Sequence, residues 1–372
     1  MDRGTVEAYE QGAEAYAAKR AAYRPERARA FAAAVGAGAG GPGGLRLDLG
    51  CGPGLYLPLL GRPVVAADAA LAMVREARRR APDAVAVQAD LGALPFRRQA
   101  FGGVWASKAH QHVAAAALPG ALRELHRVLP VGGRLDLTVF AGPVGPVADS
   151  PAPASHVTGG DDDFPGRLFT WWAPDALTDV LAGAGFTVGS LEVGDDTARR
   201  IAVTATRART LADTVGAGMR LLVCGLNPSL YAADAGVAFA RPGNRFWPAL
   251  LAAGLATTPR DPERLLAEHH IGMTDLVKRA TVAAAELTAE EYAAGLGRVE
   301  RLCRLLDPAA ICSVGLAGWR SAVDARAVAG WQERRLGPTP VYLMPSTSGL
   351  NAHSQVPALA DHLRAASLGA PS

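Results

Sequence analysis

The sequence is poor in cysteine and lacks any long apolar run. Its four cysteines, Cys51, Cys224, Cys303 and Cys312, form no C-x-x-C pair and no Cys/His cluster with zinc spacing. We therefore expect no metal site and reduced thiols in a cytoplasmic protein. No apolar stretch approaches the roughly 18 residues that cross a membrane, and no basic segment leads into an apolar one near Met1. We expect neither a membrane span nor a signal peptide.

Lysine is scarce as well, and charge of one sign does not dominate. Only Lys19, Lys108 and Lys278 occur among the 38 basic residues, so the other 35 are arginines, and the net charge is +3. Residues 1–210 carry 23 basic and 21 acidic residues, and residues 211–372 carry 15 and 14. Neither half has the strongly basic balance typical of nucleic-acid binding by charge alone, although a local basic groove is compatible with these counts.

A length of 372 residues favours two domains. Strand-like and helix-like stretches alternate, end near residue 208 and start again after it, which predicts two doubly wound α/β domains over residues 1–208 and 209–372. The halves show no common repeat, so the pattern indicates a fusion. Residues 141–166, rich in Pro, Gly, Ala and Asp, are too long for an ordinary connection and predict a lid or a mobile loop.

A glycine run follows the first predicted strand at residues 47–54, LDLGCGPG. Glycines at such spacing let the backbone turn sharply and approach a ligand, although the run alone equally fits a tight strand-to-helix turn. Asp68 ends the second predicted strand and Asp90 ends the third. Acids at these strand ends can accept hydrogen bonds from ribose hydroxyls, as in dinucleotide folds.

With "ADLGALPF" (89–96), "LRELHRVLPVGGRLDL" (122–137) and "WWAPDALTDVLAGAGF" (171–186), residues 5–206 resemble the class I S-adenosylmethionine-dependent methyltransferases. The resemblance implies a Rossmann-like domain that binds S-adenosylmethionine. It implies that the glycines wrap the methionine part, that Asp48 orients their loop or the ammonium group, that Asp68 holds the ribose and that Asp90 holds the adenine amino group. Tyr16 would close the site, and Leu91 lies in the segment that flanks the adenine. The implied cofactor residues are Tyr16, Asp48, Gly50, Gly52, Gly54, Asp68, Asp90 and Leu91.

The chain departs from this family at Gly102 and Gly103, where an acid is usual, and at Val131, where proline is usual. Both departures concern strand ends. The methyl acceptor is not predicted. His110 and His112 follow the fourth strand, and either has a side chain suited to general-base catalysis at neutral pH. A loop histidine without any proton role remains the alternative.

A second constellation begins with the strand-end motif "GLNPS" at residues 225–229. The carboxamide of Asn227, rigidified by Pro228, can hold a water molecule through its donor and its acceptor, and by itself the motif also fits a plain turn. Two further segments accompany it, "FARPGNRFW" at 239–247 and "MPSTSGLNAH" at 344–353.

Together the three segments resemble the mismatch-specific uracil/thymine DNA glycosylases, a branch of the uracil-DNA glycosylase superfamily, over residues 209–368. The resemblance implies a three-layer α/β/α domain and a flipped base in a pocket. Asn227 would position the water, Phe239 would stack on the base, and Leu350 would fill the vacated space. Backbone groups of Gly349 and Asn351 would face the orphaned guanine. The implied catalytic residues are Asn227 and Thr274, and the implied pocket and wedge residues are Gly225, Leu226, Ser229, Phe239, Asn244, Ser348, Gly349, Leu350 and Asn351.

Thr274 and Asn244 are each compatible with a purely structural role. Asp275 stands where relatives vary and can be basic, so an acid there predicts weaker phosphate contact or a changed base preference. Residues 345–349, PSTSG, differ from the Pro-Asn-Pro-Ser-Gly of many relatives. His353 is expected at the surface or facing phosphate.

We therefore expect a bifunctional enzyme. Its C-terminal domain would hydrolyse the N-glycosidic bond of uracil, or a related damaged pyrimidine, mispaired with guanine in double-stranded DNA with G·U or G·T-type mispairs. It would need no metal, cofactor or lyase step. Its N-terminal domain would methylate an unknown acceptor. The alternatives are a methyltransferase that acts mainly on a small molecule or a modified base and whose glycosylase-like domain only binds DNA, and a protein in which one domain is a non-enzymatic recruiting module. The oligomeric state is not predicted.

Overall fold

The computed structural model describes residues 1–37, 44–142, 153–194, 199–349, 351 and 354–370. The chain forms two compact units. Unit 1 consists of Met1–Leu181 and Phe186–Ala208, and unit 2 of Ala182–Gly185 and Arg209–Ser372. In the described residues no helix is long and apolar enough to cross a membrane.

Unit 1 is built on one sheet, whose described strands run in the order β3-β2-β1-β4-β5-β7-β6, with β9 beside β5 and β8 beside β9. The strands β1 to β5 and β7 are parallel neighbours, whereas β6, β8 and β9 pair in antiparallel fashion. The strand bounds are β1 Arg46–Leu49, β2 Val64–Asp68, β3 Val85–Gln88, β4 Gly103–Ser107, β5 Arg134–Ala141, β6 Ala154–Val157, β7 Leu168–Trp172, β8 Phe186–Val193 and β9 Arg200–Arg207.

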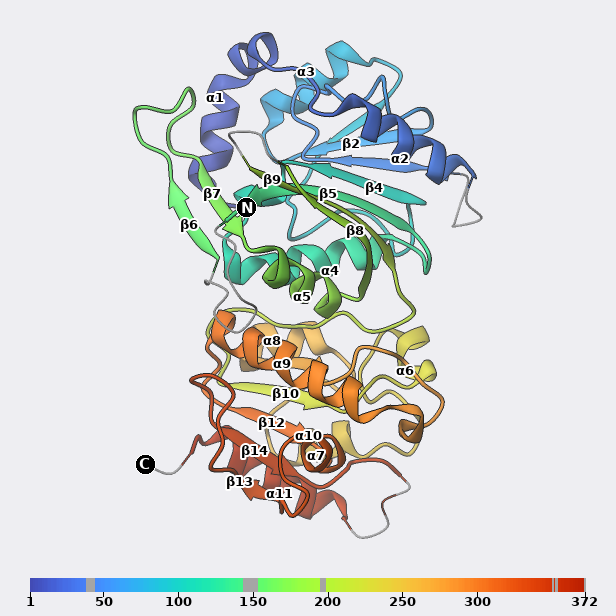
Figure 1. Cartoon of the computed structure of the whole chain (residues 1–372), viewed down its shortest axis with the longest axis vertical. Coiled ribbons are helices and arrows are strands. Elements are labelled where there is room, and N and C mark those ends of the chain that lie inside the picture. The colour runs from blue at the N-terminus through green and yellow to red at the C-terminus, as the bar shows by residue number, and fades with distance from the viewer. Residues whose placement is uncertain (38–43, 143–152, 195–198, 350, 352–353, 371–372) are drawn as a thin grey trace. The chain divides into compact units, whose positions relative to one another are not determined.

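Helices cover both faces of this sheet (Figure 1), with α1, α2 and α3 on one side and α4 and α5 on the other. The central strands are buried on both faces, as all four residues of β1 and the first four of β4 show, although β1 contains Arg46 and Asp48 among its leucines. The helix bounds are α1 Arg3–Lys19, α2 Pro25–Ala37, α3 Leu71–Arg80, α4 Leu118–Val128 and α5 Pro174–Gly183, with short 3-10 turns η2 His110–His112 and η3 Ala115–Ala117.

Unit 2 has a five-stranded sheet in the described residues, in the order β11-β10-β12-β14-β13. All of its neighbours are parallel except β13, which runs antiparallel to β14. The strand bounds are β10 Leu221–Gly225, β11 Ile271–Asp275, β12 Ile311–Val314, β13 Gly330–Trp331 and β14 Val341–Met344. The helix bounds are α6 Leu230–Ala235, α7 Phe246–Ala252, α8 Pro262–His269, α9 Ala289–Leu306, α10 Ala317–Ala322 and α11 Val356–Ser367, with η5 at Ala284–Glu286.

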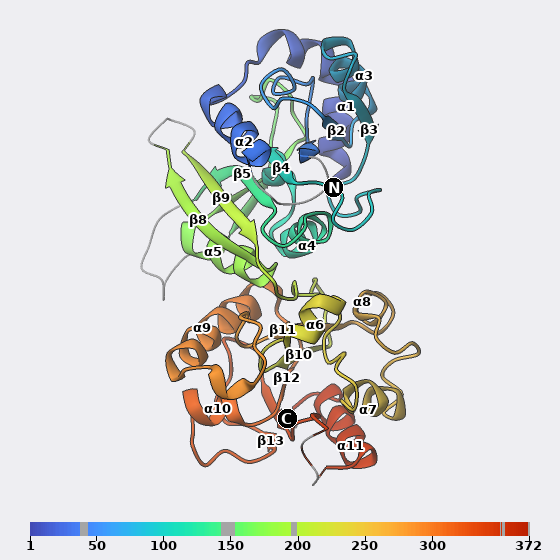
Figure 2. The ribbon, with the colours of Figure 1, turned by 90° about the vertical axis from the view of Figure 1, so that its right-hand side faces the viewer.

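The core of unit 2 explains its three layers. On one face of the sheet, Leu221 and Val223 of β10 pack in one apolar cluster with residues of α7, α8 and α11. Figure 2 shows α9 and α10 on the other side of β10–β12. A capping box in which Thr288 and Glu291 satisfy each other's backbone amides fixes the start of α9.

The predicted α/β class is confirmed for both units, but not every strand follows the predicted parallel pattern. The strands β8 and β9 are joined by residues 194–199, and this link is too short for a crossover helix, so the pair is antiparallel. The predicted loop 141–166 contains β6, which pairs with β7. Residues 143–152 of that loop lie outside the described residues.

Candidate active sites

Unit 1 has a cavity at the carboxyl ends of β1, β2 and β4. Its empty volume is about 500 Å³, part of which is open to solvent. Open parallel sheets bind ligands at this edge. The lining residues are Met1, Tyr9, Tyr16, Gly50, Gly52, Asp68, Ala69, Met73, Leu91, Ser107, Lys108, Ala109 and His112. Five of the expected cofactor residues are therefore brought together: Tyr16, Gly50, Gly52, Asp68 and Leu91.

The three glycines of the loop after β1 have different roles: two line the cavity and one allows the loop to pack on α3. Gly50, Gly52 and Gly54 have φ of +66°, +52° and +76°, a left-handed conformation that favours glycine. Gly50 and Gly52 line the cavity, and a side chain at Gly50 would overlap Ala109. A Cβ on Gly54 would lie 2.9 Å from Leu57 and 3.1 Å from Ala77 of α3. Gly54 thus allows the loop to pack on α3, outside the cavity lining.

Two carboxyl groups lie at this loop, that of the buried Asp48 and that of the half-buried Asp68. Asp68 accepts hydrogen bonds from the backbone amides of Gly52 at 2.9 Å and Ala70 at 3.0 Å. Burial raises the pKa of Asp68. Burial, and secondly the charge of Asp68, raises the pKa of Asp48 to about 8. One Asp48 carboxylate oxygen has no hydrogen-bond partner among the described residues. A ligand that brings hydroxyl donors and positive charge would satisfy this pair.

Asp90, the third expected acid, is not part of the cavity lining. It accepts a hydrogen bond from the Gly92 amide at 2.8 Å and forms an ion pair with the amino group of Met1. Met1 itself lines the cavity. Asp90 therefore lies at the edge of the cavity, one residue before the lining residue Leu91.

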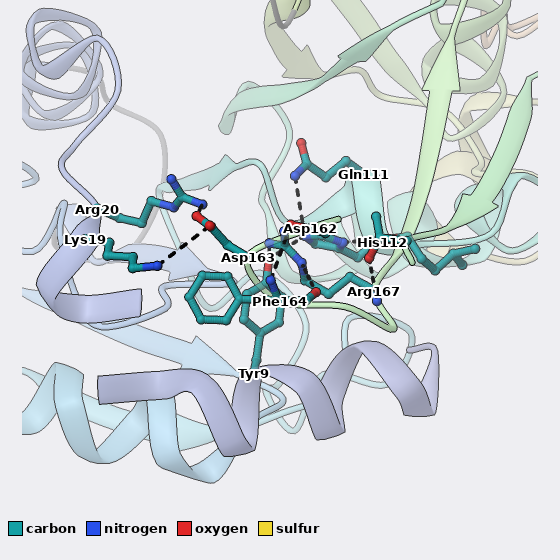
Figure 3. A network of polar contacts seen from close by, with 11 residues as sticks. Tyr9, Lys19, Arg20, Gln111, His112, Asp162, Asp163, Phe164 and Arg167 are labelled. Atoms are coloured by element: carbon teal, nitrogen blue, oxygen red, sulfur yellow. Dashed lines mark hydrogen bonds and ion pairs between the residues drawn. The ribbon is translucent and has the colours of Figure 1, made fainter. Parts of the chain in front are cut away.

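Sequence reasoning missed a hydrogen-bonded pair in the cavity wall, Tyr9 and His112 (Figure 3). The Nδ1 of His112 faces the carbonyl oxygen of Leu168 at 2.7 Å and therefore carries the proton. Its Nε2 then accepts from the Tyr9 hydroxyl at 2.9 Å, while Arg167 donates to that hydroxyl at 3.0 Å. Burial lowers the pKa of His112 to about 4. The imidazole is neutral, and the lone pair of its Nε2 accepts the hydrogen bond from Tyr9.

His110, the other candidate base, is fully buried and does not line the cavity. Neither of its ring nitrogens has a hydrogen-bond partner among the described residues, and burial lowers its pKa to about 4. Of the two histidines, only His112 is placed to face a ligand.

A salt-linked segment ties the first helix to the cavity. Arg167 pairs with Asp162 at 2.6 Å, and its guanidinium lies over the rings of Tyr9 and Phe164. The Phe164 ring lies 5.5 Å from that of Tyr16 on α1 (Figure 3 shows Phe164 beside Tyr9). These contacts place α1 over the cavity. They join residues more than 140 positions apart, so no local sequence signal could have revealed them.

In unit 2, Asn227 follows β10, and its carboxamide has a defined orientation. The Nδ2 donates to the carbonyl oxygen of Arg279 at 2.9 Å and to the Thr281 hydroxyl at 2.8 Å. Because a carbonyl oxygen accepts only, the nitrogen must be the atom that faces Arg279. The Oδ1 has no partner among the described residues, and it is left to accept a hydrogen bond from a ligand or a water molecule.

Gly225, Phe239 and Asp275 meet at the ends of β10 and β11. A Cβ on Gly225 would lie 2.6 Å from Asp275 Oδ1 and 3.3 Å from Phe239 Cζ. Phe239 has φ +56°, unusual for a bulky residue, and its ring stacks on Phe246 with centroids 4.1 Å apart. Burial raises the pKa of Asp275 to about 6, although Lys278 lowers it. The sequence analysis noted Asp275 only as a departure from relatives, whereas the structure places it against Gly225.

The hydroxyl of Thr274, an expected catalytic residue, is held in a buried ion network. It donates to Asp213 at 2.8 Å and accepts from Arg298 at 3.1 Å. Asp213 also pairs with Lys278 at 2.7 Å and with Arg298 at 3.0 Å. Successive side chains of a strand point to opposite faces, so Thr274 and its neighbour Asp275 have different surroundings.

The remaining motif residues build the frame of the site. Leu226 packs against Gly318 of α10. A Cβ added to Gly318 would lie 2.9 Å from Leu226 Cδ1, so the close approach requires glycine there. Ser229 caps α6 by accepting from the Ala232 amide at 3.1 Å. Asn244 accepts from the Phe246 amide at 2.9 Å and lines a hollow of about 420 Å³ with Phe239 and others.

Arg245, in the second motif, organises the expected wedge loop. Its backbone amide donates to Thr347 at 2.9 Å, and its guanidinium donates to the carbonyl oxygens of Ser348 at 2.7 Å, Ser354 at 2.5 Å and also Asn351. A Cβ on Gly349 would lie 2.9 Å from the carbonyl oxygen of Gly243. The structure thus brings Ser348, Gly349 and Asn351 against the second motif. Leu350 and His353 lie outside the described residues.

Comparison with known proteins gives both units a family. Residues 47–136 match the family of methyltransferase domains, and residues 212–366 match the uracil DNA glycosylase superfamily. Each match covers less than half of the chain, and together they give one segment similar to methyltransferase domains and one similar to the uracil DNA glycosylase superfamily.

Several solved structures similar to the chain are described as methyltransferases. One is an S-adenosylmethionine-dependent methyltransferase from Methanosarcina mazei, with 16% identity over 44% of this chain and 92% of that chain and a TM-score of 0.38. Another, from Mesorhizobium loti, has 20% identity over 47% and 95%, with a TM-score of 0.37. A third is the 1,6-didemethyltoxoflavin-N1-methyltransferase of Burkholderia thailandensis with bound 1,6-didemethyltoxoflavin and S-adenosylhomocysteine, with 20% identity over 55% and 85% and a TM-score of 0.41.

Proposed function

We propose that the protein is a bifunctional enzyme. Unit 2 hydrolyses the N-glycosidic bond of uracil, or of a related damaged pyrimidine, mispaired with guanine in double-stranded DNA. Unit 1 transfers a methyl group from S-adenosylmethionine to an acceptor. The observation that carries the glycosylase proposal is the Oδ1 of Asn227, which has no partner among the described residues and stands two residues after Gly225, where a Cβ would lie 3.3 Å from Phe239 Cζ.

For hydrolysis, a base must leave the duplex stack and enter the pocket. The exposed part of the Phe239 ring, backed by its stack on Phe246, offers a flat apolar face to a pyrimidine. Asn227 holds a water molecule through Oδ1 and directs it at C1′ of the sugar. The glycosidic C–N bond breaks, the base departs with the bonding electron pair, and the water oxygen bonds to C1′ and loses a proton.

The charges of unit 2 favour hydrolysis without a lyase step. A lyase needs a free amine that forms a Schiff base with the sugar. Lys278 is the only lysine after residue 108, and its ammonium is paired with the buried Asp213 at 2.7 Å. The expected product is therefore an intact strand with an abasic site.

The wedge is the second part of the glycosylase proposal. The guanidinium of Arg245 binds the carbonyl oxygens of Ser348 and Ser354 in the expected wedge loop. These hydrogen bonds support the proposal that the loop is already formed before DNA binds. In this proposal Leu350 fills the space that the flipped base vacates, and the backbone of Gly349 and Asn351 contacts the orphaned guanine.

The residues of the unit 1 cavity fit S-adenosylmethionine. Gly50 and Gly52 leave room that a side chain would fill. Asp48 is not among the lining residues, but one oxygen of its buried carboxyl group has no hydrogen-bond partner among the described residues. In this proposal Asp68 holds the ribose hydroxyls, and Tyr16 and Leu91 cover the nucleoside. When bound, the cofactor supplies an electrophilic methyl group on its sulfonium. The surrounding residues bind it, orient it and exclude water.

The glycosylase proposal is tested with duplex DNA that carries one G·U mispair. Purified protein should release uracil and leave a site that breaks only after alkali treatment. Asn227→Ala should lower the single-turnover rate at least about 100-fold, as loss of a water-positioning group does, while duplex binding stays within about threefold. Full activity of Asn227→Ala, or strand breakage without alkali, would contradict the mechanism.

The cofactor proposal is tested by calorimetry with S-adenosylhomocysteine. Asp68→Ala should abolish binding, because it removes the acceptor for the ribose hydroxyls. Asp83→Ala is the matched control, since Asp83 lies outside the cavity and pairs with Arg62 at 2.7 Å. Equal affinities of the two variants would overturn the proposed role of Asp68.

A further inference from the structure

Lys108 occupies an unusual place in the wall of the unit 1 cavity. It follows β4 directly and lines the cavity next to Ser107 and Ala109. Its backbone has φ +63°, a left-handed conformation that is costly for a residue with a side chain. The backbone amide is held there by the carbonyl oxygen of Thr138 on β5 at 2.9 Å. Such conformations persist where the surrounding structure imposes them, often at functional sites.

The ammonium group of Lys108 lies among positive charges. Its Nζ is 5.7 Å from the centre of the Tyr23 ring, and the Arg200 guanidinium is 4.6 Å from the same ring. Burial first, then the charges of Arg200 and Arg20, lowers the pKa of Lys108 to about 8. Among the described residues, Lys19 and Lys278 have carboxylate partners within 4.0 Å, whereas Lys108 has none.

The polar groups beside Lys108 are held in place. The Tyr56 hydroxyl lies 3.0 Å from the Ser107 hydroxyl, and the Tyr23 amide donates to the Tyr56 oxygen at 3.0 Å. Ser107 and the Tyr23 backbone therefore form a fixed wall on which Lys108 is presented. The Tyr56 hydroxyl donates to the Tyr23 carbonyl oxygen at 3.0 Å, so the proton of the Ser107 hydroxyl is donated to Tyr56. A bound anion would find the positive charge of Lys108 without rearrangement of this wall.

We propose that Lys108 binds an acidic group of the methyl acceptor, so that the acceptor of unit 1 is a small molecule bearing a carboxylate or phosphate. This inference rests on the proposed methyltransferase function. The sulfonium of the cofactor would add a further positive charge to a cavity in which the Lys108 ammonium has no carboxylate partner among the described residues and the one lining carboxyl group, that of Asp68, is proposed to hold the ribose. An anionic acceptor offsets both charges, whereas a cationic acceptor would add to the repulsion.

The scarcity of lysine makes the test direct. Brief acetylation at pH 8, followed by peptide mass spectrometry, reports the reaction of Lys19, Lys108 and Lys278 separately. Inorganic phosphate and succinate are the probes, with sodium chloride at matched ionic strength as the control. Either probe should slow acetylation of Lys108 at least about threefold, as roughly two-thirds occupancy of the site requires. The exposed Lys19 is the internal reference and should be unaffected. Equal effects on both lysines, or none at Lys108, would overturn the inference.

A nucleic-acid phosphate is the other source of the same chemistry. Protection of Lys108 by a short single-stranded oligonucleotide, but by neither small anion, would overturn a small-molecule acceptor. Calorimetry with S-adenosylhomocysteine separates this inference from its premise. Cofactor binding without anion protection overturns the anion site alone. Anion protection without cofactor binding overturns the methyltransferase proposal and leaves the anion without a methyl donor.

Discussion

The guanidinium of Arg245 donates to the carbonyl oxygen of Ser348 at 2.7 Å and to that of Ser354 at 2.5 Å. The second sequence motif thereby holds a loop that lies more than 100 residues further along the chain. Hydrogen bonds from a charged donor contribute about 1.5–3 kcal/mol each, so the conformation of this loop depends on one side chain.

Arg245→Met should loosen the wedge loop and leave the pocket in place. We expect uracil excision from duplex DNA to fall at least about tenfold, a change of about 1.4 kcal/mol. Excision from single-stranded DNA should fall much less, because no partner strand has to be held open. Arg241→Met is the matched control, since Arg241 belongs to the same motif and is exposed. Equal losses on the two substrates would contradict a role in the wedge.

Gly225→Ala should disturb the base pocket. The added methyl group would lie 2.6 Å from Asp275 Oδ1 and 3.3 Å from Phe239 Cζ, so both side chains must shift. Overpacking of this kind costs about 1–3 kcal/mol, and a misplaced pocket lowers excision at least about tenfold. In Gly216→Ala the new methyl group meets only Leu266, at an ordinary 3.8 Å. Thermal unfolding and single-turnover excision should be affected in the first variant only.

Tyr9→Phe should destabilise unit 1. It leaves the buried Nε2 of His112 with only the long contact to the Gln111 side-chain amide, at 3.4 Å, in place of the Tyr9 hydroxyl at 2.9 Å, and it removes an acceptor from Arg167. An unsatisfied buried group costs about 1–3 kcal/mol. Tyr16→Phe is the matched control, because the Tyr16 hydroxyl makes no hydrogen bond to the described residues although its ring also lines the cavity. Chemical denaturation of both variants checks the prediction, and equal stabilities would refute it.

The sequence predicted the features of the fold that arise from local pattern. Alternating apolar strands and amphipathic helices give the α/β class. The carboxyl ends of parallel strands share one edge, so Gly50, Gly52 and Asp68 could be expected to meet there. The antiparallel pairing of β6, β8, β9 and β13 was not predicted, because a strand's partner and direction depend on connection length as well as on its own residues.

The parts of the sites that the sequence did not reveal depend on long-range contacts. Tyr9 and Arg167 are 158 positions apart, and their hydrogen bond exists only once α1 has packed over the cavity. Lys108 is unremarkable in the sequence, since both its left-handed backbone and its positive neighbours come from tertiary packing. The resemblance to relatives suggested Thr274, whereas strand register places the neighbouring Asp275 beside Gly225.

Asp48→Asn should change how the stability of unit 1 depends on pH. Burial raises the pKa of Asp48 to about 8, with Asp68 adding to the shift, against an ordinary value near 3.8. Its ionisation therefore opposes folding, and the stability present below about pH 4 is lost as pH rises toward 8, by up to roughly 1.4 kcal/mol per pH unit. Denaturation of Asp48→Asn should show a flatter decline over this window. Asp161→Asn, at an exposed site, should retain the slope of the parent protein, and an unchanged slope in Asp48→Asn would contradict this account.

Asp275 should make uracil excision depend on pH. Its pKa is raised to about 6 by burial, with Asp213 raising it further and Lys278 and Arg298 lowering it. Below this value the neutral acid can donate a hydrogen bond to a departing base. Above it the carboxylate repels the negative charge that develops on the base, because Lys278, 3.9 Å from Oδ2 and already paired with Asp213, compensates it only in part. The single-turnover rate should fall roughly tenfold between pH 5 and pH 8.

Asp275→Asn keeps a donor without the charge, so its rate at pH 8 should exceed that of the parent and vary little with pH. Asp234→Asn, at an exposed pair with Arg209, controls for the loss of a carboxylate and should keep the parent's profile. A fall of the same size in Asp275→Asn would assign the titration to another group.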